Sequence, residues 1–551
     1  MSDKNKLYDV HEISDFKDMI IKSADMYGDS PAFMVKRSGS AYSSVSYTEL
    51  YEQIRSLATA FIEDFGLEGK KYALVSENRF EWALTYLAVV SGGGIIVPID
   101  KELPADEICS LIERSGAEVC VCSAKYFDKL AGLPQLKKTI NMDDDFDAVL
   151  NRGCELCSGG SRVFDDVKIN PDVMSALLFT SGTTDIAKGV MLSQKNIVTN
   201  IMSMSKQIKI YREDVFLCLL PLHHTYECTC GFLCPLYLGA CIAFCEGLMH
   251  IQKNMVESGT SVILGVPAIF ENMHKRIFKT AKKQGKLKML KAAMRLNGAL
   301  GHMGVDMSDR LFKDVRNSFG GRLRLMISGA AAIEPKVAKD FRRLGIMFLQ
   351  GYGLTECSPI VAVNRDVDFR DDAAGKIMDC MQLKIEGEDS DGIGEIVVKG
   401  DNVMLGYYGN PEATAEVMSD GWFRTGDLGY VDKDNFVYIT GRKKTVIIAA
   451  NGKNVFPEEL EGKLGTYREI KECVITGAKN EKTGDVEICA DIFPDYEVFG
   501  GSADDVVMAR VEAIVRELND KEPMYKKIRK VHIRKEEFEK TTTQKIKRYK
   551  M

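Results

Sequence analysis

The sequence predicts an α/β fold: a large N-terminal domain of layered α/β subdomains with a β subdomain, and a small α+β C-terminal domain. Three observations lead to this prediction. The chain of 551 residues is too long for a single hydrophobic core. Helical and strand-like patterns alternate through its first two-thirds. The pattern then changes twice, at about residue 376 and again near Arg442 to Lys444.

The N-terminal part alternates helices and strands in order. Apolar residues at helical spacing predict helices over 47–66 and 81–93. Short apolar runs predict strands within 72–78 and 94–100. Three later strand-like runs, "SVILGVP", "RLRLMISG" and "IMFLQGYG", also end in small or polar residues. Because open α/β sheets bind ligands at the carboxyl ends of their strands, the residues at each of these ends are candidates to line one binding site.

The C-terminal part follows two further patterns. Short strands and turns over 382–410 predict the β subdomain. Two strand patterns and the helical pattern "DVVMARVEAIVRELN" then predict a smaller α+β unit that ends in a lysine-rich tail. We therefore predict an N-terminal domain over residues 1–442 and a C-terminal domain over residues 443–551.

The composition is that of a soluble globular protein, with 45% hydrophobic and 28% charged residues. A net charge of −6 argues against a nucleic-acid partner. The N-terminus "MSDKNKLYDVHE" lacks the apolar segment of a signal peptide. Two uncharged runs, 82–99 and 228–245, contain glycine and proline, which favours short buried elements over membrane spans. We expect a cytoplasmic protein and leave peripheral membrane contact and oligomeric state open.

The 15 cysteines are scattered along the chain, which favours free thiols in a reducing compartment. Two groups invite a metal-binding interpretation: Cys154 with Cys157, and the three cysteines of 228–234 near His223 and His224. The second group lies in an apolar run, so buried core cysteines are the better interpretation.

One loop has the chemistry of a phosphate cradle. Within "LLFTSGTTDIAKGVMLS", Leu177 to Ser193, the loop Thr180 to Gly189 follows an apolar strand. The loop carries four hydroxyls, backbone N–H groups around Gly182, and Lys188. The spacing from Gly182 to Lys188 differs from that of a Walker loop. Taken alone, the segment could equally be a polar surface turn.

Further motifs accompany this loop, and together they resemble the acyl-adenylate-forming superfamily, which includes the acyl-CoA synthetases. The motifs, in family order, are "FTSGTTDIAKGVMLS", "LPLHHTYE", "ISGAAAI", "QGYGLTE", "WFRTGDLG", "GRKKTVIIAANGKNVFPEELE" and "KTTTQKIKR". The resemblance implies that a carboxylic acid attacks the α-phosphate of ATP, with Mg²⁺ present. It implies that a thiol, usually that of coenzyme A, then takes the acyl group and releases AMP. It also implies a mobile C-terminal domain that rotates between the two steps.

The resemblance implies a nucleotide site on the N-terminal domain. The residues it assigns to the β- and γ-phosphates are Thr180, Ser181, Gly182, Thr183, Thr184 and Lys188. Thr355 would hold the α-phosphate, and Glu356 would bind Mg²⁺ through oxygen. The residues it assigns to the adenine side are Gly329, Ala330, Ala331, Tyr352 and Gly353. From the residues alone, Thr355 could instead cap a helix, and the adenine-side residues could instead serve packing.

The resemblance also assigns the ribose to Asp427 and Arg442, which could otherwise be a turn aspartate and a surface arginine. Lys444 matches the hinge position, and Gly452 would lie against the pantetheine arm of coenzyme A. Lys545 matches the catalytic lysine that reaches the carboxylate and the α-phosphate.

His224 matches the histidine beside the substrate carboxylate or the acyl pocket, and we expect its neighbour His223 to be a packing residue. Three residues depart from the family pattern: Asp185 and Ala187 in the phosphate loop, and Gln544 before the catalytic lysine. Aspartate near a triphosphate is repulsive unless it turns outward or shares a cation. An active enzyme is the favoured hypothesis, and a non-catalytic protein that binds ATP or acyl-adenylate is the alternative.

A histidine-containing motif and the apolar run around it bear on the substrate. "LPLHHTYE" looks most like the long-chain fatty acyl-CoA synthetases, and 216–245 is rich in leucine, cysteine and phenylalanine. We therefore expect a medium- to long-chain fatty acid as the small-molecule partner. An aryl or branched acid is the alternative, and the acceptor could be an acyl carrier protein instead of coenzyme A. Most of 216–245 could equally be ordinary core.

Overall fold

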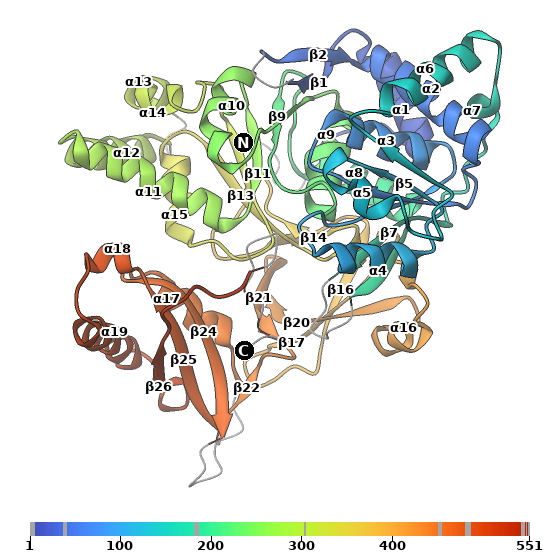
Figure 1. The fold of residues 1–551 in the computed structure, drawn as a ribbon. Helices are drawn as coiled ribbons and strands as arrows, with labels where there is room; N and C mark the ends of the chain where they lie inside the picture. Colours follow the sequence, from blue (N-terminus) through green and yellow to red (C-terminus); the bar gives the residue numbers. More distant parts are fainter. Residues whose placement is uncertain are drawn as a thin grey trace. The chain divides into compact units, whose positions relative to one another are not determined.

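The computed structural model describes residues 6–36, 41–180, 187–301, 305–449, 454–479, 486–540, 546 and 548. By its internal contacts the chain divides into two compact units (Figure 1). The first comprises Met1–Gln382 and Lys399–Phe423, and the second comprises Leu383–Val398 and Arg424–Met551. The domain boundary expected near Arg442 to Lys444 stays a prediction.

The first sheet of the first unit is mainly parallel. Its strands lie in the order β18 (Gly406–Tyr407), β8 (Lys188–Ser193), β7 (Met174–Thr180), β4 (Ile95–Pro98), β3 (Lys71–Val75), β5 (Val119–Cys122), β6 (Lys138–Asn141). Strands β8 and β18 run antiparallel to their neighbours, and the others pair in parallel. The associated helices are α2 (Tyr47–Phe65), α3 (Phe80–Ser91), α4 (Ala105–Ser115), α5 (Ala124–Leu130), α6 (Phe146–Ser158), α7 (Val163–Asp166) and α8 (Gln194–Gln207).

Two of these helices form where the sequence predicts them. Helix α2 begins at a capping box, in which the Ser46 side chain accepts the Glu49 N–H and the Glu49 carboxylate accepts the Ser46 N–H. Helix α3 is apolar around its whole circumference and is buried against β3 and β4. The run 82–99 is therefore a buried helix followed by a buried strand, as expected. No helix among the described residues is both long and apolar enough to span a bilayer.

The second sheet of the first unit is larger. Its strands lie in the order β2 (Ser43–Ser46), β1 (Pro31–Val35), β10 (Cys241–Phe244), β9 (Val215–Cys218), β11 (Val262–Gly265), β12 (Leu325–Ser328), β13 (Met347–Gly353), β14 (Ile360–Val363), β15 (Gly375–Ile377). The strands from β1 to β13 pair in parallel. The other helices of the first unit are α1 (Phe16–Tyr27), η1 (Tyr226–Leu233), α9 (Cys234–Leu238), η2 (Leu248–His250), α10 (Ile251–Ser258), α11 (Pro267–Lys283), α12 (Leu287–Gly301), α13 (Ser308–Leu311), α14 (Lys313–Asn317), α15 (Pro335–Arg343), η3 (Thr355–Cys357) and α16 (Pro411–Val417).

A large apolar core lies between this second sheet and helices α11, α12 and α15. Phe270 on α11 and Phe341 on α15 are fully buried and pack with Phe348 on β13. The core fixes strands β9, β11, β12 and β13 side by side, so that their carboxyl ends lie along one edge of the sheet.

The second unit has its own core. Its elements are β16 (Met381–Glu386), β17 (Gly394–Gly400), β20 (Trp422–Val431), β21 (Phe436–Arg442), β22 (Ile447–Ile448), β23 (Asn454–Val455), α17 (Pro457–Gly465), β24 (Ile470–Lys479), β25 (Val486–Pro494), α18 (Tyr496–Phe499), α19 (Asp504–Asn519), η4 (Met524–Lys526) and β26 (Ile528–Ile533). The two-residue strand β19 (Met418–Ser419) belongs to the first unit. Helices α17 and α19 pack on the sheet β24–β25–β26, drawn in orange to red in Figure 1. The strands and long helix expected in the C-terminal part are confirmed.

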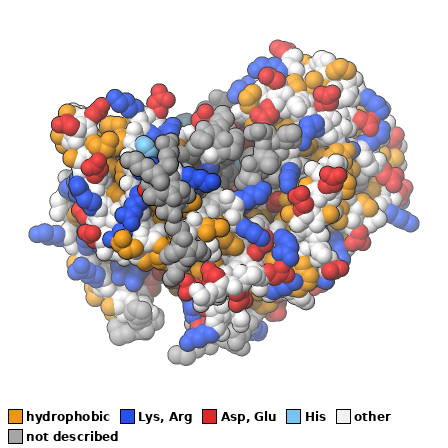
Figure 2. Space-filling view, turned by 90° about the horizontal axis from the view of Figure 1, so that it is seen from below, with side chains coloured by type: hydrophobic (Ala, Val, Ile, Leu, Met, Phe, Trp, Pro, Cys, Tyr) orange, Lys and Arg blue, Asp and Glu red, His pale blue; other side chains and the backbone are white. Residues whose placement is uncertain are grey.

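Charged side chains of both signs are interspersed over the face shown in Figure 2, with hydrophobic atoms between them.

The cysteines of the run 228–245 are largely inside: Cys228, Cys230, Cys234 and Cys241 are buried, and Cys245 is half-buried. That run forms the π-helix η1, the short helix α9 and strand β10, so it consists of short buried elements.

Candidate active site

The predicted phosphate loop connects two adjacent antiparallel strands. Thr180 ends β7 and lies directly opposite Lys188, the first residue of β8. The backbone carbonyl of Ala187 accepts a hydrogen bond from Arg114 Nη2 at 2.6 Å. The ladder therefore fixes both ends of the loop. Its central residues Ser181, Gly182, Thr183, Thr184 and Asp185 lie outside the described residues.

Tyr407 joins Lys188 to Glu356. The Lys188 Nζ atom lies 4.6 Å from the centre of the Tyr407 ring, and the Tyr407 hydroxyl donates to Glu356 Oε1 at 2.9 Å. Burial, with the Glu356 charge as a second cause, raises the pKa of Tyr407 well above its usual value, so the hydroxyl stays a donor. Strand β18, which carries Tyr407, pairs with β8, which carries Lys188.

Sequence reasoning missed Tyr407, because this residue is 51 positions from Glu356 in the chain and has no motif of its own. Only the pairing of β18 with β8 places its ring there. The backbone N–H of Met404 also donates to the carbonyl of Glu356 at 2.8 Å, which ties the same segment to η3.

Thr355 and Glu356 open the short helix η3 directly after β13. The position that precedes the helix is Leu354, which makes no side-chain cap, so Thr355 does not act as the helix cap that the residues alone allowed. The Thr355 Oγ1 atom lies 3.4 Å from Thr225 Oγ1. The segments "LPLHHTYE" and "QGYGLTE", which are far apart in the chain, therefore meet at these two hydroxyls.

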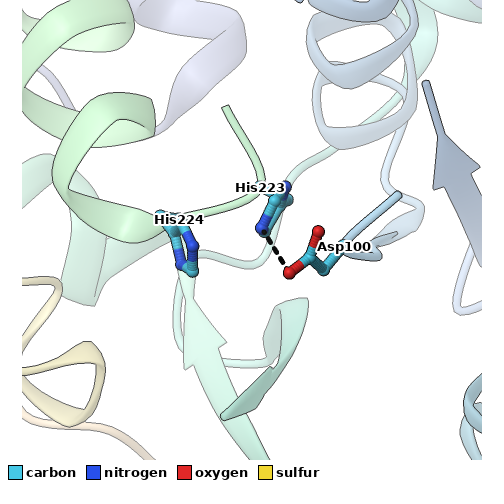
Figure 3. A group of neighbouring side chains, drawn as sticks. All are labelled: Asp100, His223 and His224. Carbon is cyan, nitrogen blue, oxygen red and sulfur yellow. Dashed lines mark ion pairs between the residues drawn. The ribbon is translucent and has the colours of Figure 1, made fainter. Parts of the chain in front are cut away.

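His223 and His224 follow strand β9, and Asp100 follows strand β4 of the other sheet. The two imidazole rings lie 4.2 Å apart, and His223 Nε2 lies 3.6 Å from Asp100 Oδ2 (Figure 3). His223 was expected to be a packing residue. It is nine-tenths buried, with a side chain 9% exposed, and its ring faces a carboxylate.

Asn78 holds the loop between β9 and these histidines. Its Nδ2 donates to the carbonyl of Leu220 at 2.7 Å, and its Oδ1 accepts the N–H of Leu222 at 3.0 Å. Asn78 itself follows strand β3, so the carboxyl ends of strands from both sheets of the first unit contribute to this region.

The adenine-side residues fall into two groups. Gly329 is buried, and a Cβ atom there would lie 2.7 Å from the Tyr226 ring, so its small size serves packing. Ala330 and Ala331, which follow it, are exposed, and Ala330 has a left-handed φ of 70°. Tyr352 is half-buried in β13, where it pairs with Ala362. Gly329 therefore has a packing role, and Ala330 and Ala331 are accessible, while the adenine-side role of all three stays a prediction.

The predicted ribose pair belongs to the second unit. Asp427 on β20 and Arg442 on β21 are direct partners in an antiparallel ladder, and Arg442 Nε forms an ion pair with Asp427 Oδ1 at 2.7 Å. The Asp427 side chain is only 4% exposed, whereas that of Arg442 is 48% exposed. Lys444 lies two residues beyond β21, and Gly452 and Lys545 lie outside the described residues, as does Gln544.

The apolar run expected to form an acyl pocket contains one buried carboxyl group. Glu227 is 1% exposed, its Oε1 accepts the N–H of Leu219 at 3.3 Å, and its Oε2 has no hydrogen-bond partner among the described residues. Burial raises the pKa of Glu227 to about 8. This glutamate is the last residue of "LPLHHTYE", and nothing in the pattern distinguished it from a surface residue.

Comparison with known proteins places the chain in a family. A sequence model described as AMP-binding enzyme matches residues 21–408, and one described as AMP-binding enzyme C-terminal domain matches residues 444–551. The long-chain-fatty-acid–CoA ligase FadD15 of Mycobacterium bovis is 28% identical over 550 residues, which span 92% of this chain and 90% of that protein. The long-chain-fatty-acid–CoA ligase ACSBG1 of Bos taurus is 31% identical over 490 residues, which span 82% of this chain and 67% of that protein.

The solved structures support the same conclusion for the fold. An anthranilate CoA ligase, AuaEII, in complex with anthranoyl-AMP superposes with a TM-score of 0.78 at 18% identity, covering 98% of this chain and 96% of that one. The predicted α/β fold class, with a large N-terminal and a smaller C-terminal part, is confirmed. With two family models that together match most of its length, the chain belongs to the AMP-binding enzyme family, among the acyl-CoA ligases.

Proposed function

We propose that this enzyme adenylates a medium- to long-chain fatty acid and transfers the acyl group to coenzyme A, releasing pyrophosphate and AMP. The observation that carries the proposal is the arrangement of Lys188, Tyr407 and Glu356 beside Thr355. Tyr407 joins the cation of the phosphate-loop motif to the carboxylate of "QGYGLTE", the motif that also carries the Thr355 hydroxyl. Phosphoryl transfer needs this kind of positioned charge more than it needs covalent help.

In the first step the acid's oxygen attacks the α-phosphorus, and the bond to the β-phosphate breaks. Thr355 would donate its hydroxyl to the α-phosphate, and Lys188 would neutralise charge on the leaving pyrophosphate. The Glu356 carboxylate suits Mg²⁺, because it is a hard oxygen ligand and Tyr407 fixes the direction of Oε1. Mg²⁺ would supply further charge neutralisation at the phosphates. Lys545 would approach the reacting oxygens from the C-terminal tail.

The second unit would hold the ribose and serve the second step. Asp427 is an acceptor-only carboxylate whose position is fixed by Arg442, and both are suited to ribose hydroxyls. In the second step the sulfur of coenzyme A attacks the acyl carbon, and AMP leaves. Gly452 would let the pantetheine arm pass where a side chain would block it. Lys444 would be the hinge between the two steps.

The choice of a fatty acid rests on the names of relatives and on the apolar run 216–245. Two relatives are named long-chain-fatty-acid–CoA ligases, and residues of that run, such as Phe232 and Leu233, are buried and apolar. An aryl acid is the second candidate, favoured by the fold similarity to an anthranilate CoA ligase. Branched acids and an acyl carrier protein as acceptor stay open. We also propose a cytoplasmic location, in agreement with the free cysteines.

The test is pyrophosphate release from the purified protein with ATP and Mg²⁺. We would supply acids from acetate through palmitate, and benzoate, with and without coenzyme A. We expect release with one chain-length class and AMP formation that rises with coenzyme A. Lys545→Ala should reduce release by more than about a hundredfold, because it removes a charge that stabilises the transition state. Lys547→Ala removes the same charge two residues away and is the matched control.

Two outcomes would contradict the proposal. Release with benzoate and none with the fatty acids would favour the aryl candidate. Tight ATP binding with no release for any acid would favour the non-catalytic alternative, in which Asp185 or Gln544 has changed the site.

A further inference from the structure

We propose that Asp100, His223 and His224 form an open binding site for a divalent transition-metal ion such as Zn²⁺, distinct from the Mg²⁺ that accompanies ATP. Each residue offers one ligand atom, and these atoms all lie within 4.8 Å of one another. Figure 3 shows the His223 ring directed at the Asp100 carboxylate, with the His224 ring beside it. It is the one such group of histidine, cysteine, aspartate or glutamate among the described residues.

The spacing of His223 and Asp100 suits a shared ion better than a hydrogen bond. His223 Nε2 and Asp100 Oδ2 are 3.6 Å apart, which is too long for a hydrogen bond. Zinc bonds of about 2.0–2.1 Å to nitrogen and oxygen place two tetrahedral ligands about 3.4 Å apart. His223 Nε2 is also buried and has no hydrogen-bond partner among the described residues. Such an atom is costly to bury, and an ion would satisfy it.

The surrounding structure holds the ligands in place. Asp100 Oδ1 accepts the N–H of Glu102 at 2.9 Å, which leaves Oδ2 facing His223. Asn78 holds the loop before the histidines through the backbone of Leu220 and Leu222. Hydrogen bonds of this kind orient ligands before a metal arrives and thereby raise affinity.

The donor set selects the class of ion. Two imidazoles and one carboxylate suit Zn²⁺ and its neighbours in the first transition series. Mg²⁺ prefers oxygen donors and is a poor match. Three protein ligands leave at least one coordination position open to a water or a carboxylate.

An ion at this position would compete with the acid substrate for His224. This consequence rests on the proposed function, in which His224 lies beside the substrate carboxylate. An ion bound to the His224 ring would prevent it from interacting with the acid and would attract the free carboxylate to itself. We therefore expect Zn²⁺ at low concentration to inhibit the acid-dependent step.

Metal binding is tested without ATP or acid, on the metal-free full chain. Cys154 is an exposed thiol, so all proteins carry Cys154→Ser. We expect one equivalent of Co²⁺ to give visible d–d bands without a thiolate charge-transfer band, and we expect Zn²⁺ to displace the Co²⁺.

Asp100→Asn keeps the acceptor for the Glu102 N–H, so the turn is preserved. Asp100→Asn and His223→Gln should each weaken binding more than about tenfold. His250→Gln, at an exposed histidine, should not change it.

Thermal melting checks that each variant is folded. Equal metal affinity in the parent, Asp100→Asn and His223→Gln would overturn the proposed site, and so would a thiolate charge-transfer band.

Inhibition is measured separately as Zn²⁺-dependent loss of pyrophosphate release, relative to each protein's own rate. We expect Asp100→Asn to raise the Zn²⁺ concentration for half-inhibition by about tenfold. Because metal binding has its own spectroscopic readout, failure of the ligase assay and failure of the metal site are distinguishable.

Discussion

At the residue scale, Glu227 shows how burial makes an acid behave unlike its surface counterparts. Its carboxyl group lies so close to Gly231 of η1 that a Cβ atom there would be 2.8 Å from it. Burial raises the pKa of Glu227 from 4.5 to about 8. Between these two values the folded protein keeps a proton that the unfolded chain releases. The free energy of unfolding therefore falls as pH rises through this window.

Glu227→Gln should remove this pH dependence. The amide oxygen keeps the acceptor for the Leu219 N–H and never ionises. The free energy of unfolding of the variant minus that of the parent should be larger, by about 2.5 kcal/mol, at about pH 7.5 than at about pH 5.5. Chemical denaturation at both pH values measures it. Glu412→Gln, at an exposed glutamate, is the control, and parallel pH curves for Glu227→Gln and the parent would contradict the prediction.

Tyr407→Phe should affect catalysis more than stability. The change removes the hydrogen bond to Glu356 but keeps the ring against Lys188. Losing one such bond to a charged group costs about 1.5 kcal/mol, which is about tenfold in the rate of adenylation. The Mg²⁺ concentration for half-maximal rate should rise as well. Tyr408→Phe, which alters the neighbouring ring against Lys71, is the control. The same loss in both variants would show that Tyr407 has no special role.

At the element scale, the turn between β13 and β14 positions Thr355 and Glu356 through a close backbone approach. A Cβ atom at Gly353 would lie 2.3 Å from the carbonyl oxygen of Pro359, which belongs to the backbone and has little room to move. The N–H of Leu354 donates to that same carbonyl at 2.9 Å. The predicted nucleotide-binding role of Gly353 is therefore accompanied by a structural requirement for glycine.

Gly353→Ala should destabilise the first unit by about 1–3 kcal/mol, because the added methyl group forces the two strands apart. Thermal unfolding should show a lower midpoint. Gly132→Ala is the matched control, because nothing lies within 4 Å of the added atom. An unchanged midpoint in Gly353→Ala would show that the turn opens without cost.

At the scale of the whole molecule, the two compact units have separate hydrophobic cores. Phe341 belongs to the core of α11, α12 and α15 in the first unit, and Leu460 belongs to the core of α17 and α19 in the second. Both side chains are fully buried. Separate cores are what a chain needs if one part is to move as a body during turnover.

Calorimetry should therefore resolve two unfolding transitions. Phe341→Ala should lower one midpoint and Leu460→Ala the other, each corresponding to about 3–5 kcal/mol lost from its own unit. Each variant serves as the control for the other. A shift of both transitions in either variant would show that the chain unfolds as a single cooperative unit.

The sequence by itself determined the alternation of helices and strands and the family. Periodicity is local, so helices such as α2, α3 and α19 could be placed from neighbouring residues alone. The family follows from motifs such as "QGYGLTE", because those residues are contiguous in the chain. The roles of Thr355, Glu356, Asp427 and Lys545 stay predictions that rest on the same motifs.

Only the tertiary structure decided which residues stand next to these motifs. Tyr407 meets Glu356, and Asp100 meets His223, because strands from distant parts of the chain pair or end side by side. It also decided that Glu227 is buried. The sequence around a helical glutamate does not indicate whether its side chain faces water or the core. The physical reason is that side-chain chemistry is encoded locally, whereas burial and proximity depend on contacts between segments that the chain order does not reveal.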